Sequence, residues 1–189
     1  MNAHATLMAF AVDATDPTVL ALAGVLSRAF ECEGMHVLPL PGLDACQTLG
    51  LLARWFPCAE LALGLAWPEP AGEECVESRY DELEDLVGLL SEHADPHAGT
   101  ADEVNCVAHA LAYACLGENH LWQDLHLPSR LELSVLIGHW FPKLAAKNTH
   151  DMKWKKFFYK QLCEREELFI CKAPSCGVCS DYTLCFGAE

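Results

Sequence analysis

Apolar residues recur along this chain at the three- and four-residue spacing of helices, in segments that begin with capping signals. Asp16 and Pro17 have the character of a helix N-cap and first turn. The apolar positions that follow them are Val19, Leu22, Ala23, Leu26 and Phe30. There is no run of alternating strand pattern and no internal repeat, so the sequence predicts an all-α domain with an irregular, cysteine-rich C-terminal tail.

Further stripes extend this pattern through the middle of the chain. The second is expected at Ala45, Leu49, Leu52, Ala53 and Phe56, ending before Pro57. Residues 66–79 are expected to form a loop. A third stripe, with acids on the opposite face, is Leu83, Leu86, Val87 and Leu90. Short strands within residues 33–41 are left as an alternative.

The remaining helices are predicted from capping signals. Thr100 and Glu103 have capping-box spacing, and Ser129 and Glu132 repeat it before "LELSVLIGHWF". Asp151 is expected to cap the final helix, "MKWKKFFYKQLCEREEL". In the helix after Thr100, the core face is Val104, Val107, Ala108, Leu111 and Cys115. Its opposite face carries Cys106, His109 and Tyr113, so we expect burial on more than one side.

Charge and composition restrict the possible partners. The formal net charge is -15, and hydrophobic residues make up 52% of the 189 positions, enough for one apolar core. Residues 1–120 carry 19 acids and 3 bases, whereas residues 121–189 carry 8 acids and 9 bases. An acidic surface repels phosphate backbones and anionic lipid, which argues against nucleic acid and membrane as partners.

The expected compartment follows from the N-terminus and the cysteines. "MNAHATLMAFAVDATDP" has neither a basic region nor a clean apolar region of a secretory signal, and no apolar stretch reaches 18 residues. We therefore expect a cytoplasmic protein. In a reducing cytoplasm, 11 cysteines indicate metal binding or small buried side chains more than disulfides.

Four of these cysteines lie within fifteen residues near the C-terminus, with the spacing C-x4-C-x2-C-x5-C. They are Cys171, Cys176, Cys179 and Cys185. Thiolates select zinc, Cu(I) or iron–sulfur clusters. Zinc sites usually have two separated cysteine pairs, so this compact spacing favours an iron–sulfur cluster; a structural zinc site and unliganded thiols are the alternatives.

The segment before the cysteines has two faces. Its apolar arc, expected to be core, is Trp154, Phe157, Phe158 and Leu162. Lys153, Lys156 and Lys160 lie on the other side, either as a solvated face or as a cationic wall beside an anionic cluster, an oxyanion or an acidic partner. Cys163 is interpreted as a half-buried bystander, with a fifth thiol near the site as the alternative.

Other polar residues carry weaker signals. Cys106 and His109 have a spacing that permits metal binding, but a core histidine bonded to backbone is favoured. Asp124 is expected to be a helix cap or a polar tether. The sequence has no phosphate-binding loop, GxSxG or HExxH pattern, so no enzymatic activity is expected.

Three blocks together resemble one known family. "NHLWQDL" (119–125), "MKWKKFFYKQLCE" (152–164) and the cysteine tail ending in "CFG" are similar to NifQ, a nitrogen-fixation protein. The similarity is strong from Asn119 to Gly187, fainter through "SRYDELEDLVGLL" and "NCVAHALAYACLG", and weak before residue 42. The chain departs from the family pattern at His126, where glycine is more usual.

The resemblance implies a function in making the iron–molybdenum cofactor of nitrogenase. It implies a molybdenum carrier that holds a Mo–Fe–S cluster on the four tail cysteines and receives its metal from molybdate or another molybdenum source. The implied partners are the NifEN scaffold complex and the nitrogenase iron protein. His120 is a further candidate contact for molybdenum or molybdate, or a residue that orients the "LWQDL" turn. Small iron–sulfur electron carriers and zinc-stapled interaction modules remain as alternative functions.

The same comparison suggests how the chain is organised. Residues 1–41 form a weakly matched N-terminal segment, residues 42–167 a helical domain, and residues 168–189 the cluster-binding tail of that same domain.

Overall fold

The computed structural model describes residues 2–33, 40, 42–64, 77–165 and 182–187, and these residues form helices and connecting turns without strands. The helices are α1 (Ala3–Ala9), α2 (Pro17–Glu33), α3 (Ala45–Trp55), α4 (Ala59–Leu63), α5 (Glu77–Glu92), α6 (Ala101–Cys115), α7 (Leu121–Asp124), α8 (Arg130–Trp140), α9 (Pro142–Lys147), α10 (Trp154–Arg165) and α11 (Tyr182–Phe186). They pack around one hydrophobic core, which confirms the all-α prediction.

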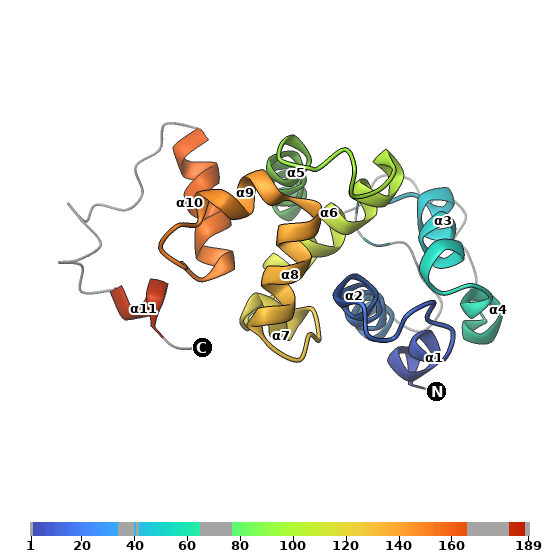
Figure 1. Ribbon diagram of the computed structural model, residues 1–189. Helices are drawn as coiled ribbons and strands as arrows, with labels where there is room; N and C mark the ends of the chain where they lie inside the picture. The colour runs from blue at the N-terminus through green and yellow to red at the C-terminus, as the bar shows by residue number, and fades with distance from the viewer. Residues whose placement is uncertain (1, 34–39, 41, 65–76, 166–181, 188–189) are drawn as a thin grey trace.

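Helix α6 lies at the centre of this core, with α2, α3 and α5 packed around it (Figure 1). Its buried residues are Cys106, Val107, Ala108, Ala110, Leu111, Ala112, Ala114 and Cys115. Because several of these are alanines, neighbouring helices can approach closely on more than one side, as the sequence predicted. The helix begins with the expected capping box between Thr100 and Glu103.

Helix α2 follows the first predicted stripe. The Asp16 carboxylate accepts a hydrogen bond from the Thr18 backbone N–H at 2.7 Å, and all five apolar positions of the stripe are buried. Gly24 permits a close approach to the turn after α7, because a Cβ there would lie 2.5 Å from the Leu125 carbonyl oxygen. Helix α2 is therefore packed directly against the segment that carries the "WQDL" block.

The predicted face of α3 is wrong in part. Leu52 and Phe56 are buried as expected, but Ala45, Leu49 and Ala53 are exposed. The helix instead buries Thr48, Leu51, Leu52 and Trp55. Apolar residues occupy two sides of this helix, and its packing against α6 selects the side that the local pattern did not favour.

Three local features at helix starts also differ from prediction. The loop expected at residues 66–79 is wrong at its end, because α5 begins at Glu77; residues 66–76 lie outside the described residues. Ser129 caps α8 through the Leu131 N–H, but its hydroxyl bonds the Glu132 carboxylate, so the reciprocal capping box does not form. The Asp151 carboxylate lies before α10 and accepts a hydrogen bond from Arg130 at 2.9 Å instead of starting the helix.

The proposed strands within residues 33–41 concern positions that are mostly outside the described residues. Among the helices that are described, none has the length and apolar character to cross a membrane.

Candidate metal centre

Of the four tail cysteines, Cys185 is the one that the structure describes; Cys171, Cys176 and Cys179 lie outside the described residues. Cys185 is half-buried on the short helix α11. Its backbone carbonyl accepts a hydrogen bond from the Lys153 N–H at 2.9 Å. This bond attaches the end of the cysteine motif to the residue that immediately precedes α10.

The glycine of the "CFG" ending fits the tight last turn of α11. The Gly187 N–H donates to the Thr183 carbonyl at 3.0 Å, closing the last turn of α11. A Cβ at Gly187 would lie 2.4 Å from that same oxygen, so a larger residue would force the turn apart. The rings of Tyr182 and Phe186 stack at 4.7 Å between centroids on the same helix.

Helix α10 supports this attachment. Trp154, Phe157 and Phe158 are buried as predicted, and Leu162 is half-buried. The Trp154 indole N–H donates to the Ser134 hydroxyl on α8 at 3.1 Å. The helix is thus packed into the core along its apolar arc and fixed to α8 at its first residue.

The predicted lysine stripe lies largely in solvent. Lys156 and Lys160 are exposed, whereas Lys153 is half-buried. Lys160 pairs with Glu164 one turn along the helix, at 3.6 Å. This supports the solvated-face interpretation for these two lysines.

The sequence analysis missed a further lysine of this helix, Lys155. Its ammonium pairs with the Asp124 carboxylate and donates to the Gly117 carbonyl at 2.9 Å. Asp124 also accepts hydrogen bonds from Arg28 at 3.2 Å and from the Asn119 side chain at 3.1 Å. The side chain of Asp124 is only 2% exposed, so this carboxylate is a buried tether, one of the two roles predicted for it.

This buried ion pair joins two of the blocks that carry the family resemblance. Asp124 belongs to "NHLWQDL" and Lys155 to "MKWKKFFYKQLCE", which are separated by 31 positions at these residues. The sequence did contain an indication of this pair, because Asp124 and Lys155 each lie among apolar residues, and a charged side chain that is buried requires a partner of opposite charge. The spacing alone did not identify which lysine faces inward.

The remaining candidate residues are not brought together with Cys185 into a recognisable group. Cys163 is half-buried on α10, as expected of a bystander. The backbone N–H of His120 donates to the Gln123 side chain at 3.1 Å at the start of α7, in agreement with a role in orienting the "LWQDL" turn. Within the described parts of the chain, no three His, Cys, Asp or Glu side chains are arranged to hold a metal ion.

Cys106 and His109 have the surroundings of core residues. The His109 Nδ1 atom lies 2.8 Å from the Asn105 carbonyl, and burial lowers the pKa of this imidazole. Burial, with the nearby Asp102 and Glu103, raises the pKa of the Cys106 thiol to about 11. A protonated thiol is a poor metal ligand, so the favoured interpretation of this pair is supported.

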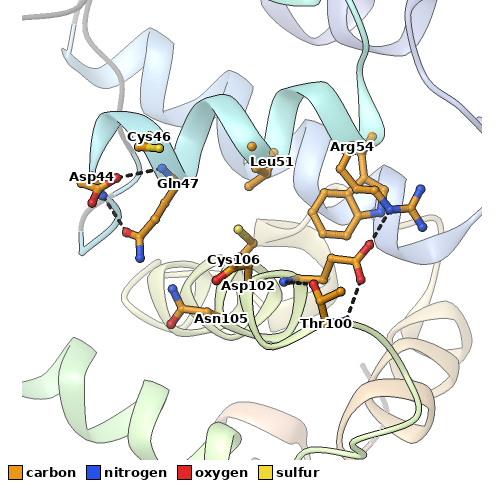
Figure 2. Close-up of a pocket in the computed structure, with 12 residues that line it drawn as sticks. Asp44, Cys46, Gln47, Leu51, Arg54, Thr100, Asp102, Asn105 and Cys106 are labelled. Atoms are coloured by element: carbon orange, nitrogen blue, oxygen red, sulfur yellow. Dashed lines mark hydrogen bonds and ion pairs between the residues drawn. The ribbon is translucent and has the colours of Figure 1, made fainter.

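A hollow of about 580 Å³ lies between α3 and α6 (Figure 2). Several of its polar groups are partnered with one another: Arg54 pairs with Glu103, which also accepts from Thr100, and Asp44 caps α3 through Gln47. Figure 1 shows α10 and α11 at the other end of the molecule. The hollow is therefore separate from the surface on which Cys185 lies.

These observations define an all-α protein in which a buried ion pair joins α10 to α7, and a backbone hydrogen bond joins α11, with Cys185, to the residue before α10. A sequence profile described as NifQ matches residues 21–187. The chain belongs to the NifQ family.

Individual relatives agree with this assignment. The chain is 49% identical to Protein NifQ of Azotobacter vinelandii over 166 residues, which cover 83% of each chain. It is 37% identical to a NifQ homolog of Sinorhizobium fredii over 87% of this chain and 69% of that protein. It is 36% identical to Protein NifQ of Rhodobacter capsulatus over 78% and 76% of the two chains. No solved structure matches.

Proposed function

We propose that this protein is a non-enzymatic molybdenum carrier for nitrogenase cofactor assembly. In this proposal it holds a Mo–Fe–S cluster as cargo on Cys171, Cys176, Cys179 and Cys185, and passes molybdenum to the assembly machinery. The observation that carries the proposal is the NifQ match through residue 187, which includes all four cysteines. Membership of that family supports a role in nitrogen fixation.

The chemistry of the donor set fits this cargo. Four thiolates are soft ligands suited to iron–sulfur clusters, and their close spacing lets one short segment surround a single inorganic group. The four core and surface cysteines Cys46, Cys58, Cys106 and Cys115 lie on other elements and are not needed for it.

The position of Cys185 fits transfer to a partner. It lies on a short peripheral helix on which Tyr182 is 46% exposed and Leu184 is 60% exposed. A cargo held at such an edge is more accessible to a second protein than one inside the helical core. We propose that the recipients are the NifEN scaffold complex and the nitrogenase iron protein, that molybdate or another molybdenum source supplies the metal, and that the exchange takes place in the cytoplasm.

Metal analysis of protein prepared without oxygen tests this proposal. We expect a brown protein that contains iron, sulfide and molybdenum. Iron without molybdenum would instead support an electron carrier, and colourless protein with zinc would support a stapled interaction module. Either result would overturn the carrier proposal.

A variant separates cluster binding from folding. Cys176→Ser should abolish cluster loading while circular dichroism shows helical content largely unchanged, because the core of the described helices is built from other residues. The matched control is Cys58→Ser, which removes an exposed thiol from another part of the chain and should load normally. A global loss of helix in Cys176→Ser would indicate that the metal has a folding role.

Delivery is tested in a cofactor assembly reaction. Loaded protein should supply molybdenum more effectively than the same amount of free molybdate. Equal performance of free molybdate would count against a carrier function.

A further inference from the structure

The structure contains a continuous path of contacts from a buried carboxylate to the tail. Asp124, on α7, binds Lys155 in the first turn of α10. Lys153, immediately before that helix, accepts the first helical hydrogen bond from Phe157 at 2.9 Å through its carbonyl. Its N–H donates in the opposite direction, to the Cys185 carbonyl on α11 at 2.9 Å.

We propose that the Asp124–Lys155 ion pair is a positioning device that fixes the start of α10 and thereby sets the place of α11 and Cys185. The inference rests on the proposed function, since it assigns these two residues a role in holding the cargo. Neither is proposed as a ligand: both act through the backbone of Lys153.

The burial of the pair is what makes it suited to positioning. The Asp124 side chain is 2% exposed and that of Lys155 is 17% exposed, whereas the other ion pairs of α10 involve side chains at least 32% exposed. An exposed pair exchanges readily with water and restrains little. A buried pair cannot separate without leaving charges uncompensated, so it restrains the position of both elements.

The pair has several supports that hold it in one geometry. The Asn119 backbone N–H and side-chain amide both donate to the Asp124 carboxylate, at 3.2 Å and 3.1 Å. The Gly117 carbonyl accepts from the same Lys155 ammonium. A Cβ at Gly117 would lie 2.4 Å from an Asp124 carboxylate oxygen, so the backbone approaches the pair as closely as it can.

Arg28 provides a matched control within the same site. It binds the other oxygen of Asp124, at 3.2 Å, but it comes from α2, so its ion pair joins α2 to α7. Replacing either Arg28 or Lys155 with methionine removes one positive charge from beside the Asp124 carboxylate. Only the replacement of Lys155 breaks the path that leads to Cys185.

The first measurement needs no metal. In apoprotein, amide hydrogen exchange at Lys153 should be about tenfold faster in Lys155→Met than in the parent chain, because the local opening becomes easier. Arg28→Met should leave exchange at this amide unchanged even if it lowers the melting temperature as much. Equal acceleration in the two variants would mean that the effect is general destabilisation, and would overturn the proposal.

The second measurement uses reconstituted protein. Iron release to a chelator should be about tenfold or more faster in Lys155→Met, since changes to groups that orient ligands commonly cost that much in metal affinity. The low-temperature EPR signal of the loaded variant should also change, while Arg28→Met should match the parent chain in both. Asp124→Asn provides a second variant if Lys155→Met does not fold.

These outcomes separate the two proposals. A parent chain that takes up no cluster on reconstitution contradicts the proposed function. A parent chain that loads normally, with the same release rate and EPR signal in Lys155→Met, contradicts the positioning role alone.

Discussion

At the scale of single residues, burial decides the chemistry of side chains that look reactive in the sequence. Cys106 and Cys115 are buried on α6, and desolvation raises the pKa of their thiols to about 11 and about 12. His109 lies on the same helix, with its ring against Gly42, where a Cβ would be 2.7 Å from the imidazole Cδ2. These groups are neutral core residues near pH 7 because charging them would cost solvation.

His109 should make the protein less stable in mild acid. Its pKa in the folded state is below the ordinary value of 6.5, mainly because of burial. The unfolded chain therefore binds a proton more readily, and the free energy of unfolding should fall as pH drops below about 6.5 towards the folded-state pKa. Melting temperatures of the parent chain and His109→Gln, measured between pH 8 and pH 5, provide the check. The parent should lose more stability over this range, and parallel curves would contradict this assignment.

At the scale of elements, the turn from α7 to α8 places a histidine in a backbone conformation that favours glycine. The His126 N–H donates to the Gln123 carbonyl and the Leu127 N–H to the Trp122 carbonyl, which is the hydrogen-bond pattern of a Schellman motif. His126 accordingly has a φ of 56°, in the left-handed region that favours glycine. The turn forms with histidine nevertheless, and its ring lies 5.6 Å from that of His4.

His126→Gly should therefore stabilise the protein. A left-handed conformation costs a residue with a Cβ roughly 1–2 kcal/mol, and glycine costs roughly 0.5–1 kcal/mol in chain entropy, so we expect a net gain of about 0.5–1 kcal/mol. Urea unfolding would measure it. The contrasting variant is His126→Val, which should be less stable than the parent because a β-branched residue tolerates positive φ poorly. A less stable glycine variant would show that the His4 contact outweighs the backbone strain.

Helix α10 is joined to three other helices by polar contacts. Trp154 bonds Ser134 on α8, Lys155 pairs with Asp124 on α7, and the Tyr159 hydroxyl donates to Glu82 on α5. Desolvation and this hydrogen bond raise the pKa of Tyr159, which keeps it a neutral donor. The helix that precedes the cysteine tail in the chain is consequently joined by polar side-chain contacts to three other helices.

At the scale of the whole molecule, the cysteines divide into groups with different surroundings. Cys46 and Cys58 are exposed, whereas Cys106 and Cys115 are buried in the core. The tail cysteines begin six residues beyond the end of α10. Among the described cysteines, the chain therefore combines thiols that pack as small apolar side chains with thiols that are exposed to solvent.

Alkylation of native protein at pH 8 should distinguish these groups. Cys46 and Cys58 should react readily, while Cys106 and Cys115 should react only after unfolding, because burial limits access and their raised pKa values leave little thiolate. Peptide mass spectrometry after timed labelling would record each site. Rapid labelling of Cys106 in the native state would contradict the packing of α3 on α6.

The amino-acid sequence by itself determined the features that depend on near neighbours. Helix starts at Asp16 and Thr100, the core arc of α10 and the spacing of the tail cysteines all follow from residues a few positions apart. The family blocks were also recognisable from the sequence, and the family assignment agrees with them. The ligand role of the four cysteines stays a prediction.

Only the tertiary structure decided which side of α3 is buried, which lysine of α10 pairs with Asp124, and that His126 adopts a left-handed turn. Each of these depends on an element distant in the chain or on the path of the backbone between elements. Several faces of a helix can satisfy the same local pattern, and the choice among them is made by the free energy of packing against partners that the pattern does not specify.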